Sequence, residues 1–302
     1  KVVKFGGSSL ASAEQFKKVG NIIRAEESRR FVVPSAPGKR FSDDTKVTDM
    51  LYKCYAEAEA GKNFDKQLKA IEERYNEIIK GLGLKLSLKE QFETIRKNFE
   101  AKAGTDYAAS RGEYLNGIIM ANYLGYEFID AASVICFDAN GEFDGEKTNK
   151  VMGDRLANVE SAVIPGFYGA MPNGAVKTFS RGGSDVTGSI VARAIKADVY
   201  ENWTDVSGIL MADPRIVHHP KRINTITYSE LRELSYIDPL TALWNRRRFR
   251  EVLSDELRRV QEEKGKGFGL AFIDVDCFKG INDTFGHSAG DVVLRRMGAV
   301  LQ

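Results

Sequence analysis

Lysine and glycine residues near the start of the chain form an arrangement that can bind phosphate. Lys4 lies in a short apolar segment, Lys1–Phe5, which is followed by Gly6, Gly7 and Ser8 before a helical pattern begins. Small residues at such a turn let backbone N–H groups approach an anion, and the dipole of the following helix favours negative charge there. A Gly-Gly turn after a strand is most often structural when it occurs alone. The pattern therefore indicates phosphate binding only in combination with other residues.

Other loops carry side chains of the same chemical kind. Arg181 and Asp185 flank a second Gly-Gly turn that opens a helix, and an arginine can hold a carboxylate through two hydrogen bonds. Glu113 lies in a predicted helix, where a solvated helical face would be the ordinary interpretation. Thr204 begins a polar loop after a strand, and this loop continues to Arg215. Several such loops that converge on one sheet edge are hard to explain structurally, and they indicate a composite ligand site.

The elements that must position these loops are strands alternating with helices. Apolar runs typical of strands lie at residues 1–5, 31–33, 126–129, 133–137, 162–164 and 199–203. Helical patterns cover most of 47–124, with breaks near residues 61, 81–83 and 104, and also 147–158 and 185–197. The alternation predicts an α/β fold, an open and mostly parallel sheet with helices on both faces. In such sheets ligands bind at loops beyond the carboxyl ends of the strands, where the glycine turns lie.

Composition argues against several classes of function. The 302 residues, enough for one large or two moderate domains, include 44 basic and 42 acidic side chains, a formal net charge of +2. The basic excess typical of proteins that bind nucleic acid or anionic membranes is missing. The cysteines and histidines show no zinc or redox spacing, and no apolar run approaches the roughly 18 residues of a membrane span. We expect a cytoplasmic protein with neither nucleic acid nor membrane as a partner.

At the positions that could do chemistry, the chain resembles the aspartokinases of the amino acid kinase superfamily. The resemblance rests on the motifs KFGGSS at 4–9, VPSAPG at 33–38, KVTD at 46–49, SRGEYL at 110–115, RGGSD at 181–185 and TDVSGILMADPR at 204–215. One position departs from the family pattern, because Leu210 stands where tyrosine is usual.

This resemblance implies transfer of the ATP γ-phosphoryl group to the side-chain carboxylate of L-aspartate, with Mg²⁺ accompanying ATP. The product would be 4-phospho-L-aspartate, and the reaction the first step of lysine, threonine and methionine biosynthesis. The acceptor is already ionised at neutral pH, so it needs no general base. The resemblance implies catalytic roles for Lys4 and Asp185 and binding of aspartate by Ser35, Thr48, Glu113 and Arg181. It implies binding of the nucleotide by Gly6, Gly7, Ser8, Thr204, Asp205 and Arg215.

From Tyr236 the chain resembles a different family, the GGDEF domains of diguanylate cyclases. The motifs are DPLTALWNRR at 238–247, with Ala242 where glycine is usual, FIDVD at 272–276, and FK at 278–279. The resemblance implies a metal ligand at Asp274 and guanine recognition by Asn282 and Asp291. The local patterns predict a helix that opens at 238–241, a buried strand at 268–275, a polar turn region at 276–287 and a helix at 291–301. The hairpin that gives the family its name is not in the sequence, so we expect no cyclase activity.

We therefore expect two parts. Residues 1–235 form an aspartokinase-like catalytic domain without its C-terminal end and ACT domains, and residues 236–302 form an N-terminal fragment of a GGDEF-like domain. The join lies in a predicted helical segment with no linker, which favours an engineered graft, a recombined chain or two joined incomplete pieces over a natural fusion. The alternatives to an aspartate kinase are a module that binds guanine nucleotide and a catalytically inactive chimera. A missing last strand could expose a sheet edge through which two copies form a homodimer.

Overall fold

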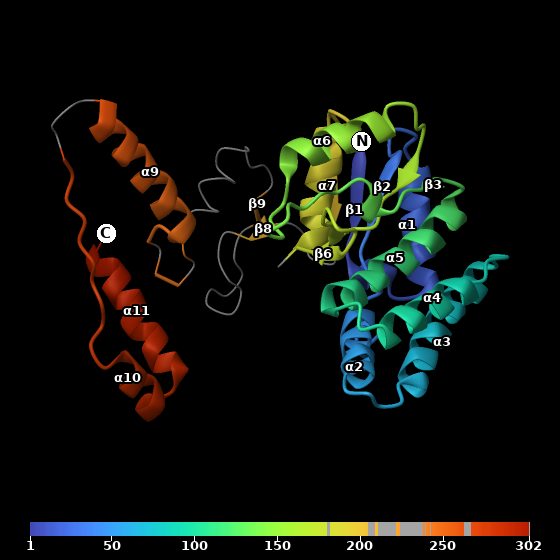
Figure 1. Cartoon of the computed structure of the whole chain (residues 1–302), viewed down its shortest axis with the longest axis horizontal. Helices are drawn as coiled ribbons and strands as arrows, with labels where there is room; N and C mark the ends of the chain where they lie inside the picture. Colours follow the sequence, from blue (N-terminus) through green and yellow to red (C-terminus); the bar gives the residue numbers. More distant parts are fainter. Residues whose placement is uncertain are drawn as a thin grey trace. The chain divides into compact units, whose positions relative to one another are not determined.

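The structure is a computed structural model that describes residues 1–179, 182–204, 209–210, 222–223, 238, 240–241, 243–262 and 267–301. The chain divides into two compact units, Lys1–Ser207 and Gly208–Gln302 (Figure 1). None of the described helices is both long enough and apolar enough to cross a membrane.

A five-stranded sheet runs through the first unit. Its strands lie in the order β3 (Glu127–Phe128), β4 (Ala162–Val163), β2 (Phe31–Pro34), β1 (Val2–Phe5) and β7 (Tyr200–Trp203). Each neighbouring pair of these strands is parallel. β1 lies between β2 and β7, with Lys4 in register with Val33 on one side and Asn202 on the other. The parallel sheet predicted from the sequence is confirmed.

Helices cover both faces of this sheet (Figure 1). One group consists of α1 (Ala13–Arg24), α2 (Val47–Glu59), α3 (Asp65–Leu82), α4 (Lys89–Glu100) and α5 (Thr105–Leu124). The other consists of α6 (Gly145–Leu156) and α7 (Gly183–Ala194). Short 3-10 helices, η1 (Gly7–Leu10) and η2 (Ala131–Ser133), follow β1 and β3.

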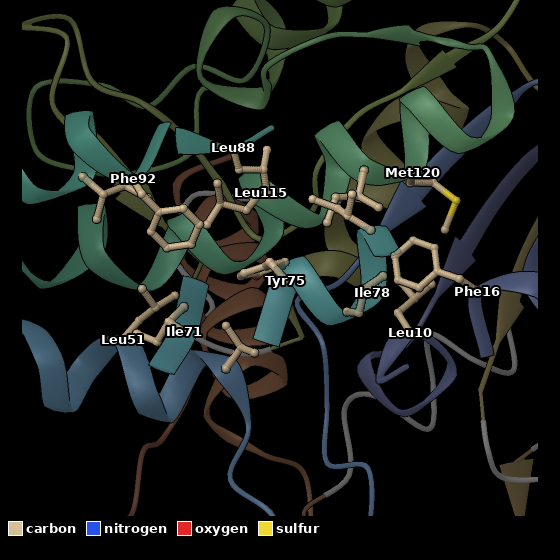
Figure 2. Close-up of a cluster of buried hydrophobic side chains, with 14 of the residues drawn as sticks. Leu10, Phe16, Leu51, Ile71, Tyr75, Ile78, Leu88, Phe92, Leu115 and Met120 are labelled. Atoms are coloured by element: carbon tan, nitrogen blue, oxygen red, sulfur yellow. The ribbon is translucent and has the colours of Figure 1, made fainter. Parts of the chain in front are cut away.

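Alternation along β1 explains why the helices form two separate packing groups. Successive side chains of a strand point to opposite faces. Val3 belongs to the hydrophobic cluster that contains α1 to α5, whereas Val2 belongs to the cluster that contains α6 and α7. Figure 2 shows part of the first cluster, in which Phe16, Leu10, Ile78 and Met120 lie together. The sheet is therefore buried on both sides, and its ligands must approach from an edge or from a strand end.

Two features of the first unit differ from the prediction. Residues 133–137 are not a regular strand, because η2 occupies their beginning and only the isolated bridges Cys136↔Ala170 and Phe137↔Phe143 follow. An antiparallel hairpin that was not predicted, β5 (Tyr168–Ala170) with β6 (Val176–Thr178), lies nearby. The apolar character of 133–137 reflects burial beside this hairpin and not membership of the main sheet.

The described part of the second unit is mainly helical. It contains α9 (Arg246–Glu262), α10 (Phe278–Phe285) and α11 (His287–Leu301), and a short antiparallel pair formed by β8 (Ile209–Leu210) and β9 (Arg222–Ile223). The predicted helix start at 238–241 is wrong, because the carboxylate of Asp238 accepts hydrogen bonds from the backbone of Leu240 and Thr241 in a turn. The predicted polar turn at 276–287 contains α10 instead.

Residues 267–275 are extended but form no strand, although the sequence predicts a buried strand there. Phe272 is 87% exposed and Ile273 is 65% exposed. A strand needs a neighbour for its backbone N–H and C=O groups. No described residue pairs with this segment, which explains why an apolar run stays outside a sheet.

Candidate active site

A cavity of about 640 Å³ lies where the carboxyl ends of the central strands meet the following loops. Its walls come from the segments after β1, β2 and β7, from the beginning of α2 and from α5. Among the residues that the sequence predicts as site residues, the cavity is lined by Lys4, Gly6, Gly7, Ser8, Ser35, Thr48, Glu113 and Thr204. Parallel strands bring these positions together because their carboxyl ends share one edge of the sheet.

The loops after β1 and β2 touch backbone to backbone. The N–H of Gly38 donates a hydrogen bond of 2.8 Å to the carbonyl oxygen of Gly7. A Cβ atom on Gly7 would lie 2.7 Å from the carbonyl oxygen of Ala36, and one on Gly38 would lie 2.6 Å from the carbonyl carbon of Gly7. Side chains cannot occupy either position without a backbone shift. The glycines therefore set the distance between two walls of the cavity.

Lys4 forms an ion pair with Asp185 at the floor of the site. The Lys4 residue is 7% exposed, and its Nζ lies 2.8 Å from Asp185 Oδ1. Asp185, in the first turn of α7, also accepts a hydrogen bond of 3.0 Å from the side-chain amide of Asn202 on β7. The ion pair fixes the end of a flexible lysine beside the glycine turn. A buried charge of this kind needs such a partner, and an anionic ligand would be a second one.

Glu113 is a buried carboxylate that is only partly satisfied. It is 6% exposed, and its Oε2 has no hydrogen-bond partner. Burial raises the pKa of Glu113 to about 7, although a hydrogen bond from the backbone N–H of Ala36 works in the opposite direction. An unpaired buried carboxylate oxygen costs free energy unless a donor reaches it. The side chain lines the cavity, so a cationic ligand group could supply that donor.

The loop between β2 and α2 contributes cations that were not predicted as site residues. Lys39, Arg40 and Lys46 line the cavity together with Phe41 and Ser42. Lys39 and Arg40 fall in no motif, and Lys46 opens the KVTD motif at 46–49 without having been assigned a role, because lysines in a loop usually face solvent. Their position at the cavity depends on how the loop is held.

Arg74 holds this loop in place from α3. The Arg74 residue is 4% exposed. Its guanidinium donates hydrogen bonds to the carbonyl oxygens of Gly38 at 2.6 Å and Thr45 at 3.2 Å. It also forms an ion pair of 2.9 Å with Asp44. The Arg40 guanidinium beside Asp44 holds the pKa of that carboxyl well below its usual range. Arg74 falls among the apolar positions of α3, and a charged residue at such a position is the sequence signal that could have indicated a buried structural contact.

Several predicted site residues are not among those that line this cavity. Arg181, Asp205 and Arg215 lie outside the described residues, and the side chain of Asn282 does too. Asp274 is exposed in the extended segment 267–275, and Asp291 is partly buried in α11. Within the described residues no three histidine, cysteine, aspartate or glutamate side chains cluster closely enough to hold a metal ion.

Comparison with known families identifies two segments. Residues 1–243 match the amino acid kinase family, and residues 235–302 match the GGDEF domain of diguanylate cyclases. The two matches overlap at residues 235–243.

Relatives and solved structures match the first segment. Aspartokinase 3 of Bacillus subtilis is 38% identical over 250 residues, covering 78% of this chain and 55% of that protein. Clostridium acetobutylicum aspartate kinase superposes with a TM-score of 0.73 at 56% identity, covering 78% of this chain and 55% of that one. Aspartokinase III of Escherichia coli, solved in complex with aspartate and ADP, superposes with a TM-score of 0.67 at 28% identity, covering 79% of this chain and 56% of that one. The chain thus spans about half the length of the relatives it matches. Because one family model accounts for most of its residues, and its fold superposes on solved members, the chain belongs to the amino acid kinase family.

Proposed function

We propose that this chain transfers the γ-phosphoryl group of ATP to the side-chain carboxylate of L-aspartate. The observation that carries the proposal is the cavity that joins a buried lysine, a glycine turn and an unpaired buried carboxylate. A cation with backbone N–H groups suits phosphate, and a carboxylate suits an ammonium group. The E. coli relative was solved with aspartate and ADP, a ligand pair that carries an ammonium group and phosphate groups.

The proposed reaction places an aspartate carboxylate oxygen on the γ-phosphorus as the bond from that phosphorus to the ADP oxygen breaks. The products are 4-phospho-L-aspartate and ADP, and no proton has to leave the acceptor. Catalysis then consists of alignment and charge neutralisation. Lys4 is the residue that would oppose the charge on the transferring group, and Asp185 would keep its ammonium in place.

On the acceptor side, Glu113 and Asp185 would face the α-ammonium group of aspartate. Ser35 and Thr48 would complete the pocket, and Arg181 would hold a carboxylate. The unpartnered Oε2 of Glu113 supports the first of these roles, because an ammonium group would satisfy it.

On the nucleotide side, the turn Gly6–Ser8 would meet the phosphates, with Thr204, Asp205 and Arg215 farther along the nucleotide. Mg²⁺ would arrive with ATP as part of the substrate complex. Magnesium commonly uses one or two protein carboxylates together with phosphate oxygens and water, so a site without a dedicated acidic cluster among the described residues fits it.

The test is aspartyl phosphate formation, trapped as the hydroxamate, with Mg-ATP and L-aspartate. The expected signal requires both substrates and is lost in Lys4→Ala. A reaction with GTP alone serves as the control for the second family match. A folded, monodisperse chain that gives no product would contradict the proposal.

For the C-terminal segment we propose a domain division at 235/236 and no cyclase activity. The family match over residues 235–302 supports the division. Asp274, Asn282 and Asp291 could at most contribute to binding of guanine nucleotide or metal. Incubation with Mg-GTP should give no cyclic dinucleotide, and a product would overturn this assignment.

A further inference from the structure

The beginning of α2 forms a second polar wall of the cavity. Both Lys46 and Thr48 line the cavity there. Lys46 is the N-cap residue, has an extended backbone and makes no side-chain capping hydrogen bond. The N–H of Val47 donates to the carbonyl oxygen of Pro37, whereas no described residue accepts a hydrogen bond from the N–H of Thr48 or Asp49. Such free N–H groups at a helix start favour an anion.

Lys46 differs from the other cations of the cavity in lacking a partner among the described residues. Lys4 pairs with Asp185, Arg40 pairs with Asp44, and the ammonium of Lys39 donates to the carbonyl oxygen of Ser42 at 3.0 Å. No such contact is found for Lys46, which is exposed at the cavity wall. Its charge is therefore available to a ligand.

An independent observation identifies the kind of ligand. Glu113, 6% exposed with an unpartnered Oε2, lines the same cavity. The two walls are close, because a Cβ atom on Gly112, next to Glu113 in α5, would lie 3.8 Å from Thr48 Oγ1 and 2.7 Å from Ala36 Cβ. An available cation and an unpaired carboxylate that share one cavity match a zwitterion. A polyphosphate fits less well, because Glu113 would repel it.

The geometry points to Lys46, with the free N–H groups of the α2 N-terminus, as a carboxylate subsite for the amino acid substrate. The ammonium group of that amino acid faces Glu113, and one of its carboxylates faces Lys46. This inference rests on the proposed function and assigns Lys46 a binding role. Lys46 is a binding residue that sets affinity for the acceptor and leaves the phosphates to Lys4 and the glycine turn.

The loop that carries Lys46 is held firmly enough for such a role. Arg74 donates to the carbonyl oxygens of Gly38 and Thr45, one at each end of the loop, and pairs with Asp44 between them. Thr45 immediately precedes Lys46. The anchor fixes the backbone, so only the lysine side chain must be ordered when the carboxylate binds, which limits the entropic cost.

The experiment is calorimetric titration of L-aspartate into the full chain with ADP present. A charge-assisted hydrogen bond lost from a binding site costs about tenfold in affinity. Lys46→Met should therefore raise the dissociation constant for aspartate about tenfold. Lys39→Met, in the same loop and at the same cavity but with a lysine that already has a partner, is the matched control and should stay within about twofold. Lys46→Arg should largely restore affinity.

Two further ligands separate this role from others. Succinate keeps both carboxylates and lacks the ammonium group, so Lys46→Met should weaken succinate binding whereas Glu113→Gln should not. ADP alone should bind Lys46→Met as it binds the unchanged chain. Unchanged aspartate affinity in Lys46→Met, an equal loss in Lys39→Met, or a loss confined to ADP would each overturn the assignment.

These readouts are independent of phosphoryl transfer. A chain that binds aspartate through Lys46 but forms no aspartyl phosphate would contradict the proposed function and leave the subsite intact. If the unchanged chain forms aspartyl phosphate and the Lys46→Met variant binds aspartate normally, the proposed function is supported and the Lys46 subsite is overturned.

Discussion

Two apolar segments of this chain have similar sequence patterns and opposite structures. Phe31–Pro34 forms β2, and Phe31, Val32 and Val33 are between 0% and 5% exposed. Residues 267–275 contain a similar apolar run that leads to one acidic residue, Asp274, yet Phe272 is 87% exposed. The first segment pairs with β1 and β4, and the second pairs with no described strand.

The difference shows what an apolar run contributes to a fold. The run supplies side chains that favour burial, but the backbone polar groups are satisfied only when a neighbouring strand exists. Where neighbours exist, they also align strand ends, and this alignment creates the cavity around Lys4 and Glu113. In the unpaired segment 267–275, no described neighbouring strand aligns Asp274 with other polar side chains. In the described part of this chain, side chains at strand ends therefore form a site where the strands pair.

The largest expected contrast is in stability. Phe16→Ala removes a fully buried ring from the core beside Leu10 and Met120 (Figure 2) and should lower the unfolding free energy by about 3–5 kcal/mol. Phe272→Ala should change it by less than about 0.5 kcal/mol, because its ring is already in water.

The measurement is urea denaturation followed by tryptophan fluorescence. The chain has two tryptophans, so a Trp244→Phe background leaves Trp203, which stacks on Phe5 with ring centroids 6.0 Å apart, as the reporter of the first unit. Equal midpoints for Phe16→Ala and Phe272→Ala would show that the two regions do not differ as described.

The next contrast compares charged residues at the two segments. Lys4→Ala should lower kcat for aspartate phosphorylation by about 100- to 1000-fold, since the charge that Lys4 opposes grows in the transition state. Asp274→Asn should leave kcat within about twofold, because Asp274 is exposed and is not among the residues that line the cavity. The hydroxamate assay at saturating substrates measures both. An unchanged kcat in Lys4→Ala would remove this lysine from the mechanism.

Much of the fold was predictable because local patterns agree with long-range packing. Helices α2, α3 and α4 follow amphipathic spacing, whereas α5 is buried over most of its surface, and all four end near glycines. The strand at 162–164 is confirmed as β4 because β2 and β3 flank it. The strand at 133–137 was not predictable in its true form, since its partner is a short hairpin that the sequence pattern does not reveal.

The residues of the candidate site also differ in how far the sequence predicts them. Lys4, Glu113 and Thr48 were predictable because family motifs mark them, and the cavity contains all three. Lys46 lies in the same motif as Thr48 but was not identified as a ligand residue, because its position depends on Arg74, which contacts the loop from a different helix. The contacts of Arg74 with the loop, which place Lys46 at the cavity, are tertiary contacts, and a local sequence pattern does not reveal them.

A smaller contrast is expected at two glycines. Gly7→Ala would place a Cβ atom 2.7 Å from the carbonyl oxygen of Ala36, so the β1 and β2 loops must separate, at a cost of about 1–3 kcal/mol. Gly269→Ala meets no atom within 4 Å and should shift the unfolding free energy by less than about 0.5 kcal/mol. Thermal unfolding with the hydroxamate assay would measure both effects. A Gly7→Ala chain with full stability and activity would contradict the close approach.

The smallest expected effect is a pH dependence that belongs to the buried site and has no counterpart in the exposed segment. Burial raises the pKa of Glu113 from 4.5 to about 7, so the folded chain keeps a proton that the unfolded chain loses between these values. Linkage then requires the unfolding free energy to fall as pH rises through this window, because the folded state binds more protons.

Only ionised Glu113 can accept an ammonium group, and its ionised fraction falls about tenfold from pH 8 to pH 6, so the dissociation constant for L-aspartate should rise about tenfold. Calorimetric titration at both pH values measures this change, and Glu113→Gln, which cannot titrate, should bind weakly with little pH dependence. If that variant retained the full tenfold dependence, another group would be responsible, and the unpaired carboxylate would not be the ammonium site.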